Sequence, residues 1–322
     1  MKTILQVLAA SMVLALVSDA TLAQGLGGKR PVRILVASPP GGPSDTQIRL
    51  LVPKMSEMLG QTLIVDNRPS NNGVVASEIA AKAAPDGLTF AVGNSGTHAV
   101  NATLYAQLPY DILRDFAPIS QFSTTGLVVA ANPRLPGRSV QDLVAFAKNQ
   151  PGKLNVAIAG ATGELAGDAL WARLNLKMTN VRYKGSSPSE LSLLSGETDL
   201  AMLTPLATRN HLQSGRLKAY GITSLKRSPV LPDVPTFDEQ GVQGFEIQFW
   251  NGLFAPAGTP ARIVNAMNKA VVYALHAPEV TERFKQLGLV IVGHSPQEFS
   301  AVVKRDVEKF RKVIIESGIA RL

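Results

Sequence analysis

The sequence predicts an α/β protein with two similar halves. Short apolar segments rich in β-branched residues alternate with segments of helical periodicity along residues 32–98, and the same order returns along residues 154–203. Strand, loop, helix and strand in this order are typical of a parallel sheet. In the first half, polar or glycine-containing loops follow three of the strands, at residues 38–45, 68–73 and 93–98. Because ligands bind beyond the carboxyl ends of such strands, we expect these loops to converge on one site.

The first of these loops joins a predicted strand, Val32–Val36, to a predicted helix. We expect Ser44 or Asp45 to cap that helix, because both residue types accept hydrogen bonds from the first-turn N–H groups. Gly41 and Gly42 let a ligand approach the backbone closely, and the helix dipole adds partial positive charge. The loop therefore favours an anion. An ordinary strand-to-helix connection is the alternative, because the loop matches no nucleotide-binding motif.

The other elements are predicted from the same signals. We expect further strands at residues 61–67, 88–92, 127–130, 154–158, 181–185, 200–203 and 217–223. We expect helices at residues 74–84, 140–148, 164–174, 187–196, 261–275, 278–287 and 297–316. Ser139 is the expected cap of the helix at residues 140–148, and residues 108–118 are expected to be irregular. In the second half, residues 159–163 form another glycine-containing loop before a helix.

Composition and the first residues indicate an exported protein. Residues 1–23 have the basic start, apolar run and small residues before Gln24 that are typical of a cleaved signal peptide. The absence of cysteine excludes disulfides and lipid attachment at an N-terminal cysteine, and with export it suggests the bacterial periplasm. The net charge of +8 is scattered without a run of five basic residues, so we expect no nucleic-acid partner. The charge indicates solubility and a mild preference for anionic ligands.

The sequence contains no recognisable catalytic or metal-binding set of residues. The four histidines lack metal-ligand spacing, so we expect no metal, no cofactor and no catalytic residues. His98 is expected to be a structural donor rather than a base, and Asp45 a cap or loop tie rather than a general base. Trp171 is expected in the core, while for Trp250 the core and a cleft stay open as alternatives. Non-covalent capture of a small polar molecule between two closing lobes fits these features.

Nine short motifs resemble those of the Bug-type periplasmic solute-binding proteins associated with tripartite tricarboxylate transporters. The first are Pro39-Pro40-Gly41-Gly42-Pro43-Ser44-Asp45, Asp66-Asn67-Arg68-Pro69, Ala84-Pro85-Asp86-Gly87, Leu108-Pro109-Tyr110-Asp111 and Asp115-Phe116-Ala117-Pro118. The others are Asn149-Gln150-Pro151-Gly152-Lys153-Leu154-Asn155, Tyr183-Lys184-Gly185, Arg227-Ser228-Pro229 with Leu231-Pro232-Asp233-Val234-Pro235-Thr236, and Ala255-Pro256-Ala257-Gly258-Thr259-Pro260. The order of the motifs is specific, and the similarity covers essentially all of the chain after residue 23.

The resemblance implies a two-lobed periplasmic binding protein, type II-like, in which each lobe is a mainly parallel sheet flanked by helices and the ligand lies in the interdomain cleft. It implies a first domain of residues 24–124 plus 246–322 and a second domain of residues 125–245. A monomer would capture a small organic carboxylate, or a related aromatic acid, amino acid or amide, and deliver it to the membrane permease subunits of the transporter. Presentation of the closed form to a membrane sensor kinase is the alternative that the sequence leaves open.

The resemblance also implies which positions of this chain bind the ligand. In the first domain these are Ser38, Pro39, Gly41, Gly42, Ser44, Asp45, Asn71, Asn72, Gly73, Ser95 and Thr97. In the second domain they are Gly160, Thr162, Gly163, Glu164, Tyr183 and Thr204. The N–H groups of Gly41, Gly42 and Gly73 would hold one carboxylate, partly through water. The hydroxyls of Ser95 and Thr97 would complete its surroundings.

The sequence departs from the family pattern at three places. Glu164 stands where many members carry a histidine. In the cleft it would repel a second ligand carboxylate and favour an amine or hydroxyl; alternatively it turns outward as a first-turn helix residue. Asn71 and Asn72 add side-chain donors and acceptors to a loop that usually has small residues. Arg182 replaces a proline that often precedes Tyr-Lys-Gly, either as a cleft cation or as a surface charge.

Overall fold

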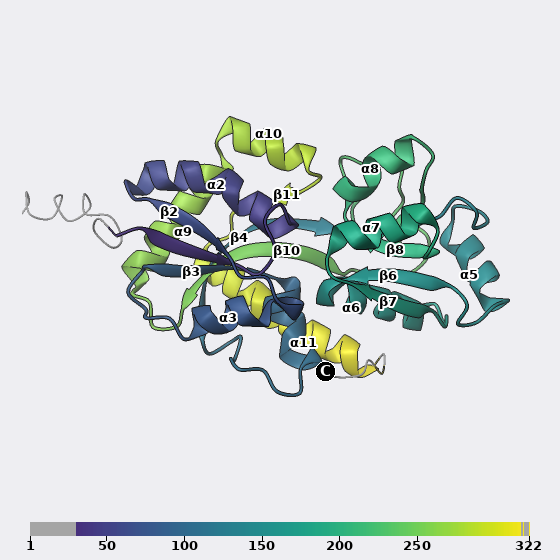
Figure 1. Cartoon of the computed structure of the whole chain (residues 1–322), viewed down its shortest axis with the longest axis horizontal. Helices are drawn as coiled ribbons and strands as arrows, with labels where there is room; N and C mark the ends of the chain where they lie inside the picture. The colour runs from purple at the N-terminus through teal and green to yellow at the C-terminus, as the bar shows by residue number, and fades with distance from the viewer. Residues whose placement is uncertain (1–29, 317, 319–321) are drawn as a thin grey trace, which may run out of the picture.

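The computed structural model describes residues 30–316, 318 and 322, so the expected signal peptide at residues 1–23 lies outside the described residues. Two β-sheets, each with its own helices, form two lobes that lie side by side (Figure 1). The first lobe contains strands from both the early and the late part of the chain, and the second lobe contains only strands from the middle. The two-lobed α/β class expected from the sequence is therefore present.

The first lobe is built on a six-stranded sheet. Its strands are β1 (Val32–Val36), β2 (Leu63–Asn67), β3 (Thr89–Asn94), β4 (Phe116–Gly126), β10 (Gln248–Pro256) and β11 (Val290–Ile291), in the order β11-β4-β10-β3-β1-β2. Its helices are α2 (Pro43–Leu59), α3 (Val74–Ala81), α4 (Asn101–Leu104), α9 (Ala261–Leu275), α10 (Pro278–Gln286) and α11 (Pro296–Glu316). Two short helical turns, η1 (Asn71–Gly73) and η2 (Gly96–Val100), follow β2 and β3.

The second lobe is built on a five-stranded sheet. Its strands are β5 (Val128–Ala131), β6 (Asn155–Ala159), β7 (Thr179–Tyr183), β8 (Leu200–Leu203) and β9 (Lys218–Ile222), in the order β7-β6-β8-β5-β9. Its helices are α5 (Val140–Lys148), α6 (Gly160–Arg173), α7 (Ser186–Ser195) and α8 (Pro205–Gln213). Ser139 caps α5 as expected. Its hydroxyl accepts from the Asp142 N–H, and the Asp142 carboxylate accepts from the Ser139 N–H, which together form a capping box.

Both sheets are mixed rather than mainly parallel. β1 is parallel to β2 and β3, but β10 is antiparallel to both β3 and β4. In the second sheet β6 is parallel to β7 and β8, and β5 is antiparallel to β8 and β9. The antiparallel strands are those nearest the crossings between lobes, since the chain enters the second lobe through β4 and β5 and returns through β10. A strand that returns in this way runs against its neighbours.

Several local features differ from the sequence expectations. β4 occupies part of the passage expected to be irregular, and α8, β10 and β11 were not among the expected elements. β4 was missed because Pro118 and several polar residues interrupt its apolar pattern, and the strand is bulged where it pairs with β10. The segments at residues 159–163 and 93–98 are largely the first turns of α6 and η2 rather than open loops.

Two polypeptide crossings join the lobes at one buried threonine. The Leu127 N–H donates to Thr223 Oγ1 at 2.9 Å, and the same hydroxyl donates to the Ile247 carbonyl at 2.5 Å. The Thr223 N–H in turn donates to the Leu127 carbonyl at 2.9 Å. Thr223 is fully buried. These bonds place the outgoing and returning chains side by side, which is the arrangement that a hinge between lobes requires.

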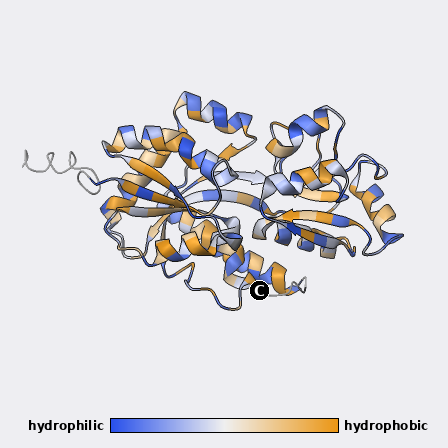
Figure 2. Cartoon of the chain, viewed as in Figure 1, coloured by the Kyte–Doolittle hydropathy of each residue, from blue (hydrophilic) through white to orange (hydrophobic). Residues whose placement is uncertain are grey.

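Hydrophobic packing fills the interior of each lobe and continues beneath the boundary between them. Figure 2 shows the apolar residues concentrated along the strands and on the inward faces of the helices. Trp171 of α6 and Trp250 of β10 are both buried in the core. The alternative left open for Trp250 is thereby decided, and its Nε1 donates to Asp306 of α11 at 2.8 Å.

The absence of a side chain at Gly252 is required for α11 to pack on the first sheet. A Cβ atom at Gly252 would lie 2.2 Å and 2.5 Å from ring atoms of Phe299 and 2.9 Å from the carbonyl oxygen of Ser120. Phe299 is fully buried, so its ring cannot move aside without disturbing the core.

We expect Gly252→Ala to lower the free energy of unfolding by about 1–3 kcal/mol, because overpacking forces side chains and backbone to shift. Denaturant titration followed by circular dichroism measures this change. The matched control is Gly163→Ala on α6, where an added Cβ would meet Met202 at an ordinary 3.8 Å. If both variants unfold at the same denaturant concentration as the unaltered protein, the predicted close packing at Gly252 is wrong.

Candidate functional site

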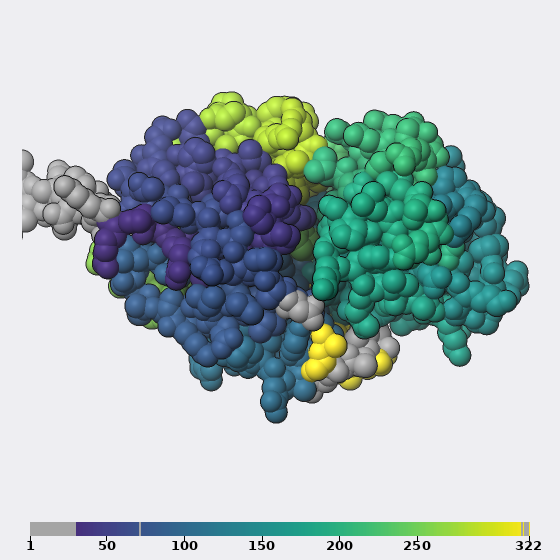
Figure 3. Space-filling view, in the orientation of Figure 1, coloured from purple at the N-terminus to yellow at the C-terminus, as the bar shows by residue number. Residues whose placement is uncertain are grey.

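The candidate site is the groove between the two lobes, which the space-filling view shows from one side (Figure 3). In Figure 1, α2 and α6 both begin at the side of their own lobe that faces the other lobe. Each follows the carboxyl end of a parallel strand, β1 for α2 and β6 for α6. Across the groove, Ser95 Oγ and Thr162 Oγ1 lie 3.0 Å apart in a buried hydrogen bond. The structure thus brings Ser95 of the first lobe and Thr162 of the second together.

The first turn of α2 has no side-chain cap. Gly42 occupies the N-cap position and Pro43 the first helical position. The expectation that Ser44 or Asp45 caps the helix was wrong, because the Ser44 hydroxyl donates to Asn251 Oδ1 at 2.6 Å and the Asp45 carboxylate turns back to the loop. The N–H groups of Ser44 and Asp45 have no residue four positions earlier in the helix to accept from them. They are therefore first-turn donors without an acceptor inside the helix.

Asp45 ties three segments of the first lobe together. Its carboxylate accepts hydrogen bonds from the Gly41 N–H at 2.8 Å, from Asn67 Nδ2 at 2.8 Å and from Arg49 Nε at 2.9 Å. Burial would raise the pKa of Asp45, but the bonds from Arg49, Gly41 and Asn67 outweigh it and hold the pKa below its usual value. Asp45 is thus an ionised loop tie, as the sequence suggested, and it fixes the shape of the glycine loop.

The three backbone N–H groups expected to hold a carboxylate all have acceptors within the chain. The Gly41 N–H donates to Asp45, the Gly42 N–H to the Pro39 carbonyl at 3.0 Å, and the Gly73 N–H to the Ser70 carbonyl at 3.2 Å. Tight turns use their own N–H groups in this way. Gly73 still matters for shape, because a Cβ there would lie 2.5 Å from Thr97 Cγ2. The N–H groups of Ser44 and Asp45 are the better candidates for ligand contact.

Thr97 and His98 form a buried support behind Ser95. Thr97 Oγ1 lies 2.8 Å from His98 Nδ1 and accepts from the Asn94 N–H at 2.9 Å. The His98 ring stacks on Phe254 and meets Phe116 edge-on, with centroids 4.2 Å and 4.6 Å away. Complete burial lowers the pKa of His98 to about 3. His98 is therefore a neutral structural residue, and the Thr97 hydroxyl holds the turn rather than projecting freely.

The other first-lobe positions have mixed surroundings. Ser38 Oγ is buried and has no hydrogen-bond partner among the described residues, while Pro39 is exposed. Asn72 adopts a left-handed conformation with φ 48°, and its Nδ2 donates to the Tyr105 hydroxyl at 3.3 Å. Asn71 begins the turn η1.

In the second lobe, Glu164 is bound by Arg182. Arg182 Nε donates to Glu164 Oε1 at 2.9 Å, and Nη2 donates to the same oxygen. Glu164 is 7% exposed, so it does not turn outward, and it is the fifth residue of α6 rather than a first-turn residue. Glu164 and Arg182, two of the positions that depart from the family pattern, are therefore partners.

The remaining second-lobe positions that were expected to bind the ligand have structural roles within their own lobe. Gly160 begins α6 with φ +74°, and Gly163 packs toward Met202. The Tyr183 hydroxyl donates to Glu197 at 2.9 Å. Thr204 caps α8 by accepting from the Ala207 N–H at 3.4 Å.

Sequence reasoning missed Asn251, which lies on β10 behind the first turn of α2. Its side chain is fully buried, its Oδ1 accepts from Ser44, and its Nδ2 has no acceptor in the described part of the chain. A buried donor without an acceptor is costly unless a ligand or water pairs with it. The sequence signal that could have identified Asn251 is its position as an amide side chain within the aromatic and apolar run at residues 249–254.

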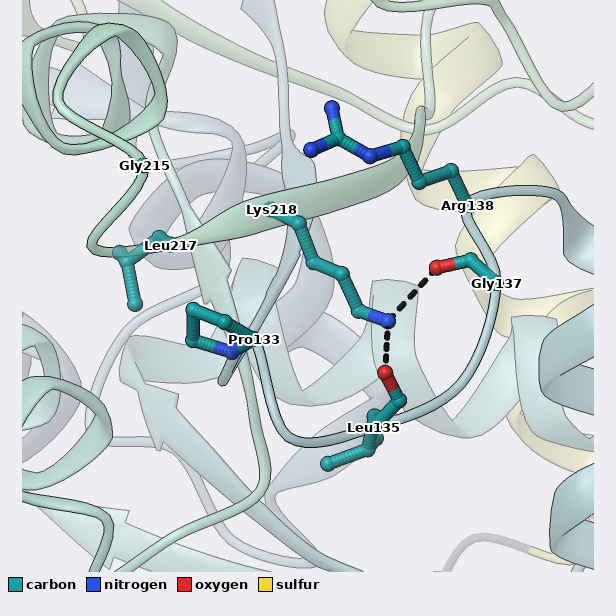
Figure 4. A pocket seen from close by; sticks show the side chains of 7 residues that line it. All are labelled: Pro133, Leu135, Gly137, Arg138, Gly215, Leu217 and Lys218. Carbon is teal, nitrogen blue, oxygen red and sulfur yellow. Dashed lines mark hydrogen bonds between the residues drawn. The ribbon is translucent and has the colours of Figure 1, made fainter.

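A cavity of about 320 Å³ lies elsewhere, in the second lobe (Figure 4). Lys218 points toward the loop before α5 and donates to the carbonyls of Gly137, at 2.6 Å, and Leu135. The Tyr220 hydroxyl donates to the Pro136 carbonyl at 2.6 Å. Three successive carbonyls are thus held by two side chains, and the cavity beside them contains none of the expected ligand-binding positions.

Within residues 30–316, 318 and 322, no helix is both long and apolar enough to cross a membrane. The same residues contain no group of three or more histidine, aspartate or glutamate side chains that could hold a metal ion.

Residues 48–319 match the model of the family described as the tripartite tricarboxylate transporter family receptor. A UPF0065 protein from the tcbD-tcbE intergenic region of Pseudomonas sp. (strain P51) is 38% identical over 314 residues, which cover 95% of this chain and 93% of that protein. Protein BugT of Bordetella pertussis is 32% identical over 292 residues, which cover 90% of each protein.

Solved structures share the architecture. Rpa4515 of R. palustris, determined with adipate, superposes with a TM-score of 0.84 at 32% identity and covers 91% of this chain and 99% of that one. MatC (Rpa3494) from Rhodopseudomonas palustris, with bound malate, gives a TM-score of 0.81 at 31% identity and covers 88% and 99%. These comparisons confirm the resemblance and the fold class expected from the sequence motifs.

The buried His98 makes stability depend on pH. Its pKa is about 3 in the folded protein against 6.5 for an ordinary histidine, so the unfolded chain binds a proton first as the pH falls. Between about pH 6 and pH 4 we expect the free energy of unfolding to fall by roughly 1.4 kcal/mol per pH unit through this residue alone. Denaturant titrations of the unaltered protein and His98→Gln, compared at each pH, isolate the contribution. Equal pH slopes for the two proteins would contradict it.

Proposed function

Because the chain belongs to the tripartite tricarboxylate transporter receptor family, we propose that it is an extracytoplasmic solute-binding protein. It captures a small organic carboxylate in the groove between its lobes and delivers it to the membrane permease subunits of such a transporter. The ligand is held without chemical change. Export to the periplasm is part of this proposal and rests on the signal-peptide pattern of residues 1–23.

The observation that carries the proposal is the set of donors at the first turn of α2. The N–H groups of Ser44 and Asp45 begin an uncapped helix whose dipole favours negative charge. Asn251, whose Oδ1 accepts from Ser44, adds a fully buried donor, its Nδ2 group. Ser38 Oγ, also buried and without a partner in the described residues, adds a hydroxyl. Backbone, amide and hydroxyl donors together suit one carboxylate.

The second lobe supports capture by closure. α6 also begins without a side-chain cap, and its Thr162 meets Ser95 of the first lobe. A ligand held at α2 would therefore be covered by the first turn of α6. We propose that the moving parts are residues 24–124 plus 246–322 and residues 125–245, with the hinge where Thr223 joins the crossing chains. The membership of β1–β4, β10 and β11 in one sheet and β5–β9 in the other supports this division.

The ligands of the similar structures support the chemical class. Adipate and malate are both small carboxylates, and they are bound by Rpa4515 and MatC respectively. Because these proteins are only 31–32% identical to this chain, we propose the chemical class of the ligand, a small carboxylate, and not adipate or malate itself.

The direct test is thermal unfolding of the mature protein with a panel of mono-, di- and tricarboxylates, aromatic acids and amino acids. A ligand present at about 100 times its dissociation constant stabilises the folded state by about 2.7 kcal/mol. For a chain of this size each kcal/mol raises the melting temperature by roughly 2–4 °C. We expect at least one carboxylate to give such a shift, while its methyl ester gives none. Equal shifts with acid and ester would contradict recognition of the charge.

The buried amide of Asn251 provides a local test. Asn251→Asp keeps an acceptor for Ser44 but replaces the unpaired donor with an acid, so we expect carboxylate affinity to fall at least about tenfold, a loss of ~1.4 kcal/mol. Isothermal titration calorimetry measures the affinity, and circular dichroism checks the fold.

Ser44→Ala is the matched control for this variant. It removes the bond from Ser44 to Asn251, which Asn251→Asp can keep, but it leaves the Asn251 donor in place, so we expect a smaller loss of affinity. Unchanged binding by folded Asn251→Asp would show that Asn251 does not face the ligand.

A further inference from the structure

The paired residues Glu164 and Arg182 lie beside the groove. Glu164, the fifth residue of α6, follows Thr162, which contacts the first lobe, by two residues. Arg182 is the last residue but one of β7 and pairs in register with Ile158 of β6, the strand that leads directly into α6. Both side chains are therefore placed where the carboxyl ends of β6 and β7 meet the groove.

The pair is asymmetric in its bonding and exposure. Both Nε and Nη2 of Arg182 donate to one oxygen of Glu164, Oε1. The side chain of Glu164 is 9% exposed and that of Arg182 is 65% exposed. A guanidinium has a further N–H-bearing edge, and a carboxylate has a second oxygen. The pair therefore offers hydrogen-bond donors beside an acceptor.

The charges around the Glu164–Arg182 pair disfavour both a negatively charged and a positively charged group at this end of the ligand. One helical turn after Glu164, Asp168 accepts from Asn180 Nδ2 at 2.6 Å, and burial raises the pKa of Asp168. A second ligand carboxylate would meet two acidic side chains and one guanidinium already paired to one of them. A ligand ammonium would meet the exposed guanidinium. The exposed Lys184, two residues after Arg182, is the other nearby charge on this strand end.

We propose that the Glu164–Arg182 pair determines which chemical group the ligand carries at the end remote from its carboxylate. The preferred group is neutral and can both donate and accept hydrogen bonds, and a primary carboxamide is the simplest example. The carboxamide oxygen would accept from Arg182 while its NH₂ donates to Glu164. This inference rests on the proposed function, because it assumes that the carboxylate of the ligand is held at α2.

The test compares ligands that differ only at the remote end. Calorimetric titrations use a linear dicarboxylate, its monoamide and the corresponding ω-amino acid, each at chain lengths from succinate to adipate. For the unaltered protein we expect the monoamide to bind at least tenfold more tightly than the dicarboxylate and the amino acid of the same length.

Two single substitutions should move this ranking in opposite directions. Glu164→Gln leaves Arg182 without its anion, so the dicarboxylate should gain at least tenfold relative to the monoamide. Arg182→Gln leaves Glu164 without its cation, so the ω-amino acid should gain relative to the monoamide. Lys184→Gln, which removes one positive charge two residues away, is the matched control and should leave the ranking unchanged.

The outcomes separate this inference from the proposed function. Two outcomes would overturn the inference alone. In the first, the unaltered protein binds these ligands but prefers the dicarboxylate. In the second, it binds them with a ranking that neither single variant changes. Binding of none of these carboxylates by the unaltered protein, at any length, would overturn the proposed function and the inference with it. Circular dichroism of each variant confirms that the fold is kept before affinities are compared.

Discussion

The uncapped first turn of α2 is the constraint on which the groove depends. A helix start needs acceptors for its first N–H groups, and the chain provides Gly42 and Pro43 there instead of a capping side chain. Asp45, the acid nearest to that turn, is used to hold Gly41, Arg49 and Asn67. These bonds fix the shape of the loop, while the N–H groups of Ser44 and Asp45 have no acceptor within the helix. Asn251 lies behind this turn with one amide group unpaired in the described chain, which extends the donor set into the sheet.

The parts of the fold that could be predicted are those in which local pattern and tertiary structure agree. Strand Val32–Val36, helix Val140–Lys148 with its Ser139 cap, and helix Ala261–Leu275 all show clear periodicity and termini. Strand β4 was missed because it carries buried polar residues, such as Ser120 and Ser123, which form hydrogen bonds with distant parts of the chain, and a strand with such a pattern does not resemble an apolar one. Tertiary hydrogen bonds thus stabilise a strand that the local pattern does not indicate.

The sequence indicates a candidate site, but it does not reveal the hydrogen bonds of that site. The glycine loops indicate an anion site, yet the N–H groups of Gly41, Gly42 and Gly73 have acceptors within the chain. The contact between Ser95 and Thr162 joins residues 67 positions apart, and no local rule predicts it. Glu164 and Arg182 looked like two separate departures from a family pattern, and only the fold shows that they are partners.

The most direct measurement is ¹⁵N–¹H NMR of the backbone amides during titration with a carboxylate that binds. If the first turn of α2 holds the carboxylate, the signals of Ser44 and Asp45 should shift downfield and their hydrogen exchange should slow, because their N–H groups gain a charged acceptor. The amides of Gly41 and Gly42, which already donate within the chain, should change less. Saturation with ligand that leaves Ser44 and Asp45 unperturbed would contradict the assignment of the carboxylate to this helix start.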